Sequence, residues 1–163
     1  YMAAVEKGVR QALEDGVVAG FPVHDARVIV HDGKSHAVDS KDIAFFSAGR
    51  KATIEAIRAA SPIILEPVVD IEILAPDASV GDLAGDLSSK RGQVTGTQPR
   101  GVGTMSIGGK VPLAELDDYQ GRLKSLTGGQ GAYTIAFSHY APVPMQTQQQ
   151  LASQHKAVVL EDD

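Results

Sequence analysis

The chain has 163 residues, a formal net charge of −5 and 43% hydrophobic residues, which predicts one domain or two small ones with ordinary apolar cores. The absence of cysteine excludes disulfide bonds, thiolate metal sites and cysteine nucleophiles, and the acidic balance excludes a protein that coats nucleic acid through bulk charge. Because no apolar run reaches the roughly 18 residues that span a bilayer, and the first residues do not form a signal peptide, we expect a soluble, cytoplasmic chain.

The first elements in the chain are a helix and a strand. Apolar residues at helical spacing between Val5 and Leu13 predict an N-terminal helix that ends near Asp15. Side chains that alternate over Val23–His31 then predict a strand, and Asp32-Gly33 predicts a turn after it. This turn exposes His36, which is therefore placed to touch a partner.

A second helix is expected over about residues 40–60, capped by Asp39 or Ser40. Its expected buried residues include Ile43, Phe46, Ile54 and Ile57. One strand and two helices do not make a sheet, so the unit over residues 1–62 is expected to be incomplete. We expect its strand to pair with strands upstream in a longer parent protein, or with another chain.

Residues 63–144 predict a complete α+β domain. The expected elements are a strand over 67–74, a helix over 80–87, two strands over 93–98 and 103–111 joined by a turn, a helix over 113–126 and a strand over 132–140. Ser79 is the expected cap of the first of these helices. The βαββαβ order predicts a ferredoxin-like four-stranded antiparallel sheet covered by two helices. Residues 145–163 form a tail, with a short helix over 146–154 and a frayed end over 157–163.

The motifs favour no enzyme site in this chain. The phosphate-loop pattern is absent, so the chain itself should not bind GTP, and no nucleophile elbow is present. His24, His31, Asp25 and Asp32 form an alternative metal site, but strand alternation sends the two histidines to opposite faces. A sheet that stacks RNA bases is a further alternative, although Gly103–Lys110 contains no aromatic residue. We expect no cofactor and no metal.

Several motifs in one order resemble the end of the fourth domain and the fifth domain of translation elongation factor G, the GTPase that drives translocation on the ribosome. They lie in residues 5–10, 19–23, 32–40, 64–67, 81–87, 91–101, 111–115 and 139–144. Together they cover nearly all of residues 1–145. The resemblance implies a parent GTPase that binds GTP and magnesium in an N-terminal domain and has the ribosome as its partner.

The resemblance also implies roles for individual residues. The turn with Lys34, Ser35 and His36 corresponds to the tip that contacts transfer RNA and messenger RNA at the decoding centre of the small subunit. In the fifth domain, Arg91 and Arg100 are candidates for contacts with ribosomal RNA, since a guanidinium suits phosphate. Two alternatives remain open: His36 as a plain solvated turn residue, and Arg91 as a cation that complements a helix C-terminus.

The chain also departs from the family pattern. Ser35 stands where translocating factors usually have tyrosine, and Leu116-Asp117-Asp118 replaces the usual Met-Phe-Gly. These departures favour an elongation-factor-G-like paralogue. The role of such a parent stays open between translocation, ribosome recycling and another step on the ribosome. The alternatives to a ribosomal role are a stand-alone ferredoxin-like regulatory or protein-interaction module and a histidine-based metal enzyme.

Overall fold

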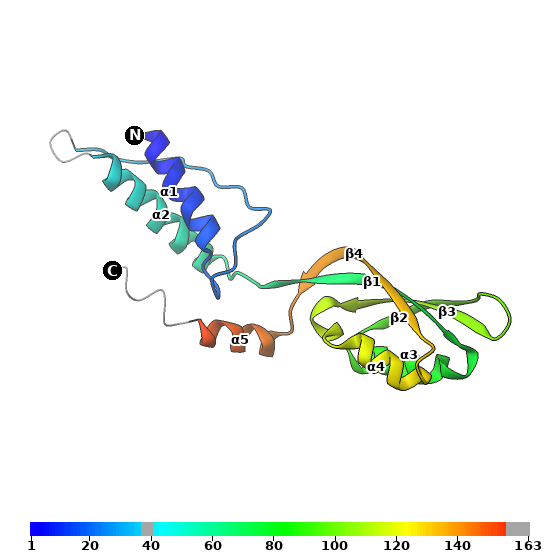
Figure 1. Cartoon of the computed structure of the whole chain (residues 1–163). Helices are drawn as coiled ribbons and strands as arrows, with labels where there is room; N and C mark the ends of the chain where they lie inside the picture. Colours follow the sequence, from blue (N-terminus) through cyan, green and yellow to red (C-terminus); the bar gives the residue numbers. More distant parts are fainter. Residues whose placement is uncertain (37–40, 156–163) are drawn as a thin grey trace. The chain divides into compact units, whose positions relative to one another are not determined.

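A computed structural model describes residues 1–36 and 41–155, which form two compact units. One unit contains Tyr1–Ile64 and the chain from Val143 onward, and the other contains Leu65–Pro142. The second unit has a complete sheet, whereas the described residues of the first contain helices and irregular segments only (Figure 1). None of the helices in these described ranges is long and apolar enough to cross a membrane.

The second unit is a four-stranded antiparallel sheet with its helices packed on one face (Figure 1). In chain order its elements are β1 (Leu65–Pro76), α3 (Val80–Ser89), β2 (Gln93–Pro99), β3 (Thr104–Pro112), α4 (Tyr119–Thr127) and β4 (Ala132–Pro142). The strands lie side by side in the order β2-β3-β1-β4. The predicted ferredoxin-like arrangement is therefore confirmed.

The core forms because β1 alternates between apolar and charged residues. Val69, Ile71 and Ile73 are buried on the helix-covered face, while Asp70 and Glu72 are exposed on the other face. The core partners of β1 are Leu83, Leu87, Ile107, Val111, Leu116, Tyr119 and Leu123. Each fully buried aliphatic side chain contributes about 1.5–3 kcal/mol, so this alternation holds the helices on the sheet.

Two details of the helices differ from the prediction. Ser79 is the last residue of the 3₁₀ turn η1 (Asp77–Ser79) and the N-cap residue of α3, but its side chain forms no capping hydrogen bond. The single helix expected over 113–126 is wrong, because the structure has a 3₁₀ turn, η2 (Leu113–Leu116), followed by the separate helix α4. Asp118 separates them with a φ of 53°, a left-handed conformation that a right-handed helix cannot continue.

In the first unit, α1 (Met2–Asp15) and α2 (Asp42–Ala59) pack together through two glycines. A Cβ atom on Gly8 would lie 2.1 Å from the carbonyl oxygen of Phe46, and one on Gly49 would lie 2.7 Å from that of Val5. Both glycines are buried. The close approach of the two helix backbones therefore depends on the missing side chains.

The strand predicted over Val23–His31 is wrong for this chain, because residues 24–36 form neither a strand nor a helix. A strand needs a neighbour for its backbone groups, and within the described residues none pairs with this segment. Val28, Ile29 and Val30 are accordingly exposed. Ile43, expected to be buried, is 73% exposed, since α1 packs on the stripe of α2 that contains Gly49 and not on the stripe with Ile43.

The predicted helix near the C-terminus is confirmed as α5 (Met145–Gln154). Its Gln148 side chain binds the segment that follows α2: the amide oxygen accepts a hydrogen bond from the backbone N–H of Ile64, 3.1 Å away, and the amide nitrogen donates to the carbonyl of Pro62, 3.2 Å away. The predicted capping residues Asp39 and Ser40, and the predicted frayed end 157–163, lie outside the described residues.

Candidate functional site

The turn predicted to expose His36 is an irregular segment of the first unit. Lys34, Ser35 and His36 are all exposed there. The carboxylate of Asp32 accepts a hydrogen bond from the backbone N–H of Gly33 at 2.8 Å, which holds the start of the turn. Such a segment presents mixed charge and one imidazole, a group that can donate or accept hydrogen bonds.

Arg91 forms a clamp between three segments of the second unit. It follows α3 with a φ of 58°, and its guanidinium donates to both oxygens of Glu66 on β1, at 2.6 and 3.2 Å. Its Nε atom donates to Glu115 of η2 at 2.8 Å. The hydrogen bonds to Glu66, followed by the single hydrogen bond to Glu115, raise the pKa of Arg91, which stays charged. Arg91 thus has a structural role in the fold.

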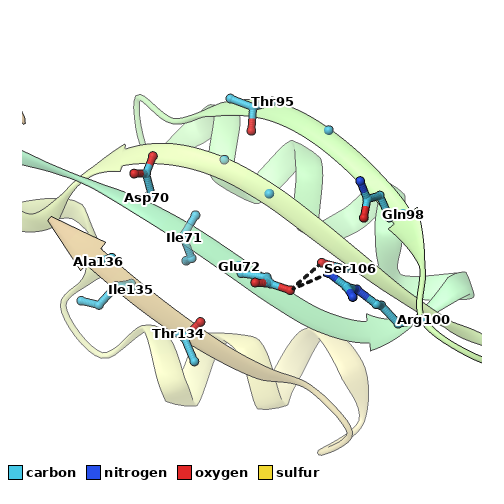
Figure 2. Close-up of a pocket in the computed structure, with 13 residues that line it drawn as sticks. Asp70, Ile71, Glu72, Thr95, Gln98, Arg100, Ser106, Thr134, Ile135 and Ala136 are labelled. Atoms are coloured by element: carbon cyan, nitrogen blue, oxygen red, sulfur yellow. Dashed lines mark hydrogen bonds and ion pairs between the residues drawn. The ribbon is translucent and has the colours of Figure 1, made fainter. Parts of the chain in front are cut away.

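Arg100 lies in the turn between β2 and β3 and is held less firmly. A terminal nitrogen of its guanidinium is 3.6 Å from Oε1 of Glu72, and its side chain is 54% exposed. Figure 2 shows that the same carboxylate also accepts a hydrogen bond from the Ser106 hydroxyl, at 3.0 Å. Much of the Arg100 guanidinium therefore faces solvent.

The structure does not bring these two arginines together. The carboxylates that they bind, Glu66 and Glu72, are six residues apart on β1, which is about 20 Å along an extended strand. The two arginines therefore lie on separate parts of the second unit. Lys34, Ser35 and His36 belong to the first unit.

A pocket of about 490 Å³ lies on the open face of the sheet (Figure 2). Its charged side chains are paired across the strands: Asp70 with Lys110, and Glu72 with Arg100. The lining also includes Thr95, Gly96, Gln98, Gly108, Gly109 and Thr134, and no aromatic side chain is among the described residues that line it. This face offers neither net positive charge nor rings on which bases stack.

A buried carboxylate, that of Asp86, lies between α3 and α4 and was not predicted from the sequence. The Asp86 side chain is 2% exposed, and its Oδ1 atom accepts hydrogen bonds from Lys90 at 2.9 Å and Arg122 at 3.0 Å. Burial alone would raise the pKa of Asp86, but the hydrogen bonds and charges of Lys90 and Arg122 together hold it below its usual value. The i,i+4 spacing of Asp86 and Lys90 was a visible signal, whereas Arg122 is distant in sequence.

The alternative metal site is not assembled in the part of the chain that the structure describes. Within residues 1–36 and 41–155, no group of three or more histidine, aspartate or glutamate side chains is arranged to hold a metal ion. His24 and His31 are both exposed on the irregular segment. Because this segment is not a strand, the predicted placement of the two histidines on opposite faces of a strand does not apply to it.

Comparison with known families matches both units in order. Residues 1–61 match the family described as elongation factor G, domain IV, and residues 63–151 match the family described as elongation factor G C-terminus.

Relatives match over nearly the whole chain. It is 39% identical, over its full length, to an elongation factor G-like protein of Thermotoga maritima, and 42% identical, over 96% of its length, to elongation factor G of Aquifex pyrophilus. A crystal structure of a protein from Thermus thermophilus superimposes with a TM-score of 0.81 at 41% identity, over 96% of this chain and 24% of that one. The chain spans 24% and 22% of the length of the two named relatives. The two family matches, which lie in one order and cover both units, place this chain in the elongation factor G family.

Proposed function

We propose that this chain is the ribosome-contacting C-terminal part of an elongation-factor-G-type translational GTPase, which acts in translocation or a related step on the ribosome. The observation that carries the proposal is the ordered match of residues 1–61 and 63–151 to two parts of one family. The parent protein is cytoplasmic and binds GTP and Mg²⁺ in a domain N-terminal to this chain. In support, the relatives are about four times as long as the chain, which lacks the phosphate-loop pattern.

The turn that contains Lys34, Ser35 and His36 is proposed to enter the decoding centre and to contact transfer RNA and messenger RNA. The exposure of all three residues supports this proposal. A short turn of mixed charge makes a few hydrogen bonds in an RNA groove and then leaves, whereas a strongly basic turn would bind the RNA persistently. His36 supplies the imidazole for such contacts.

Arg100 and Arg91 are proposed to contact ribosomal RNA from the second unit. Arg100 is the better placed of the two, because its single ion pair is long and its side chain is 54% exposed. The guanidinium of Arg91 already binds two carboxylates. Any phosphate contact of Arg91 is therefore made by its exposed edge, in addition to the clamp.

One organisational proposal accompanies this function. The chain divides into a domain-IV-like part over residues 1–62, a ferredoxin-like domain over 63–144 and a C-terminal tail over 145–163. The family matches over residues 1–61 and 63–151 support this division.

The test is the cosedimentation of the full-length parent with ribosomes, in the presence of GTP or GDP. We expect GTP-dependent binding, and we expect His36→Ala to slow translocation or the related step while binding persists. His24→Ala is the matched control, since His24 is also exposed but lies outside the turn. If binding is absent with GTP, the ribosomal function is overturned; if both histidine variants behave like the wild type, only the role of the turn is lost.

A second measurement addresses the arginines. Ribosome binding of Arg100→Gln and of the double variant with Arg91→Gln is compared at two salt concentrations. A phosphate contact predicts weaker binding and a smaller dependence on salt, by about one unit of slope for each contact. An unchanged affinity and slope would remove both residues from the RNA interface.

A further inference from the structure

The sheet of the second unit has two edges, and they differ in how they are protected. β2 is seven residues long, has an irregular register between Val94 and Gly96, and ends at Pro99, features that discourage pairing with another strand. β4 is eleven residues long and has no lysine, arginine or acidic residue. Its register with β1 is irregular between Phe137 and His139 and it also ends at a proline, Pro142, but the register is regular over Ala132–Phe137. The outer edge of this regular run of six residues therefore offers an unprotected row of backbone donors and acceptors.

Apolar side chains lie beside this edge. Ile135 and Phe137 pair with Ile71 and Val69, so they lie on the helix-covered face of the sheet. They are nevertheless 45% and 59% exposed. Among the described residues, β4 supplies only Tyr133 to the packing of the core. The helices thus stop short of this part of β4 and leave its apolar face open.

The uncovered face borders an apolar groove between η2 and β4. A pocket of about 490 Å³ is lined by Leu113, Ala114, Leu116, Asp117, Tyr133 and Ile135. Leu113 is 41% exposed at its rim. At the other end of the uncovered face, the rings of Phe137 and Tyr140 lie 5.1 Å apart, and Tyr140 is 61% exposed. The groove has room for aliphatic side chains from a partner.

The charge of the rim decides which class of partner fits. Asp117 lines the groove and is exposed, and Asp118 follows it. No cation is paired with Asp117 or Asp118 among the ion pairs of the described residues. An acidic rim repels RNA phosphates and attracts lysine or arginine. Together with an open strand edge, it favours a polypeptide partner over a nucleic acid.

We propose that β4 and the adjoining groove bind an extended basic segment of a partner protein, which adds to the sheet as a fifth strand. Backbone hydrogen bonds join the segment to the edge of β4. Alternate side chains of the segment lie on Ile135 and Phe137, and a basic side chain on the same face pairs with Asp117. This interaction is separate from the RNA contacts of the proposed function and does not depend on them.

The test uses the 163-residue chain and a capped synthetic peptide, Thr-Val-Thr-Val-Thr-Lys-Thr, in which the valines and the lysine share one face. Backbone amide NMR spectra are recorded during a titration with this peptide. We expect saturable shifts of the amide signals of β4 and η2, with the signals of β2 unchanged. Absence of saturable shifts in β4 would overturn the proposal.

Variants and modified peptides separate the parts of the proposal. Phe137→Ser is expected to weaken binding about tenfold, and Asp117→Lys at least about threefold. Leu74→Ser and Asp77→Lys are the matched controls, because both residues are exposed and lie outside the groove, and they should leave the affinity unchanged. A peptide with N-methylated backbone groups facing β4 should not bind, a result that needs no protein variant.

Two outcomes would contradict the choice of partner. A peptide with glutamate in place of lysine that binds equally well would remove the role of the acidic rim. Self-association of the chain in sedimentation experiments, abolished by Phe137→Ser, would mean that a second copy of the chain covers the groove. Either result would overturn the assignment of a basic segment.

Discussion

Arg91 and Glu66 form a bidentate ion pair that joins the end of α3 to the first residues of β1, with hydrogen bonds of 2.6 and 3.2 Å. The Glu66 residue is 8% exposed, so it has little water to replace a lost partner. The pair is separated by 25 residues in the chain, and it fixes the turn that leads from α3 into β2. Arg91, a predicted RNA ligand, thus helps to hold its own domain together.

Arg91→Gln is expected to lower the free energy of unfolding by about 1–3 kcal/mol, because it leaves a buried carboxylate without its charged partner. Urea denaturation monitored by circular dichroism measures this loss. Arg100→Gln is the matched control and should change stability by less than about 0.5 kcal/mol, since the Arg100 and Glu72 side chains are 54% and 49% exposed. Equal effects of the two substitutions would contradict the structural role of Arg91.

The pKa of Asp86 predicts how acid affects stability. Because its pKa in the folded chain is lowered from 3.8, the stabilisation is fully present above pH 3.8 and is lost as the pH falls through the lower folded value. We expect Asp86→Asn to destabilise the chain at pH 7 and to reduce its loss of stability in this acidic window. Urea midpoints measured from pH 7 downward test this. Asp82→Asn is the control, because Asp82 is an exposed residue of α3, and the pH dependence of its midpoint should match that of the wild type.

The pKa of Tyr119 predicts how stability changes at alkaline pH. Burial, followed by the negative charge of Asp86, raises the pKa of Tyr119 from 10.0 to about 12. The folded chain therefore favours the neutral phenol, and this stabilisation is fully present below pH 10 and is lost as the pH rises toward 12. Phenolate absorbance should show one tyrosine that titrates late, and this late step should be absent from Tyr119→Phe.

The Tyr119→Phe variant also tests the hydroxyl of this residue. That hydroxyl is buried and has no hydrogen-bond partner among the described residues. At neutral pH we expect its removal to leave stability unchanged or to raise it by up to about 1 kcal/mol, because no hydrogen bond is lost. A loss of more than about 1 kcal/mol, measured by thermal unfolding, would mean that the hydroxyl is satisfied in solution.

Gly8→Ala tests the close contact of α1 with α2. An added Cβ would lie 2.1 Å from the carbonyl oxygen of Phe46, so the helices must separate. We expect a loss of about 2 kcal/mol or more in the first unit, which overrides the usual helical preference for alanine. Gly85→Ala, in α3, is the control: no atom lies within 4 Å of the added Cβ, and the substitution should stabilise the chain slightly. Amide exchange of α1 and α2 measures the effect of Gly8→Ala, and amide exchange of α3 measures that of Gly85→Ala.

Local pattern predicted most of the second unit. The alternation of Val69, Ile71 and Ile73 with Asp70 and Glu72 indicated β1 and its buried face, and the confirmed ferredoxin-like arrangement followed from the succession of elements. These predictions succeed because side-chain periodicity and turn residues are properties of neighbours in the chain. The prediction of a strand over 23–31 was wrong because it depended on a distant partner. The side chains alternate as in a strand, but pairing requires a second strand beside it, and none of the described residues supplies one.

By itself, the sequence determined the α+β class, the ferredoxin-like order, the family and the exposed turn that contains His36. Only the tertiary structure decided that Arg91 binds Glu66 and Glu115, that Asp86 gains Arg122 as a second cation, and that Ile135 and Phe137 on β4 stay uncovered. Each of these depends on atoms far apart in the chain. Spacing along a sequence records which face a residue occupies, but the identity of its distant neighbour arises only when the layers pack.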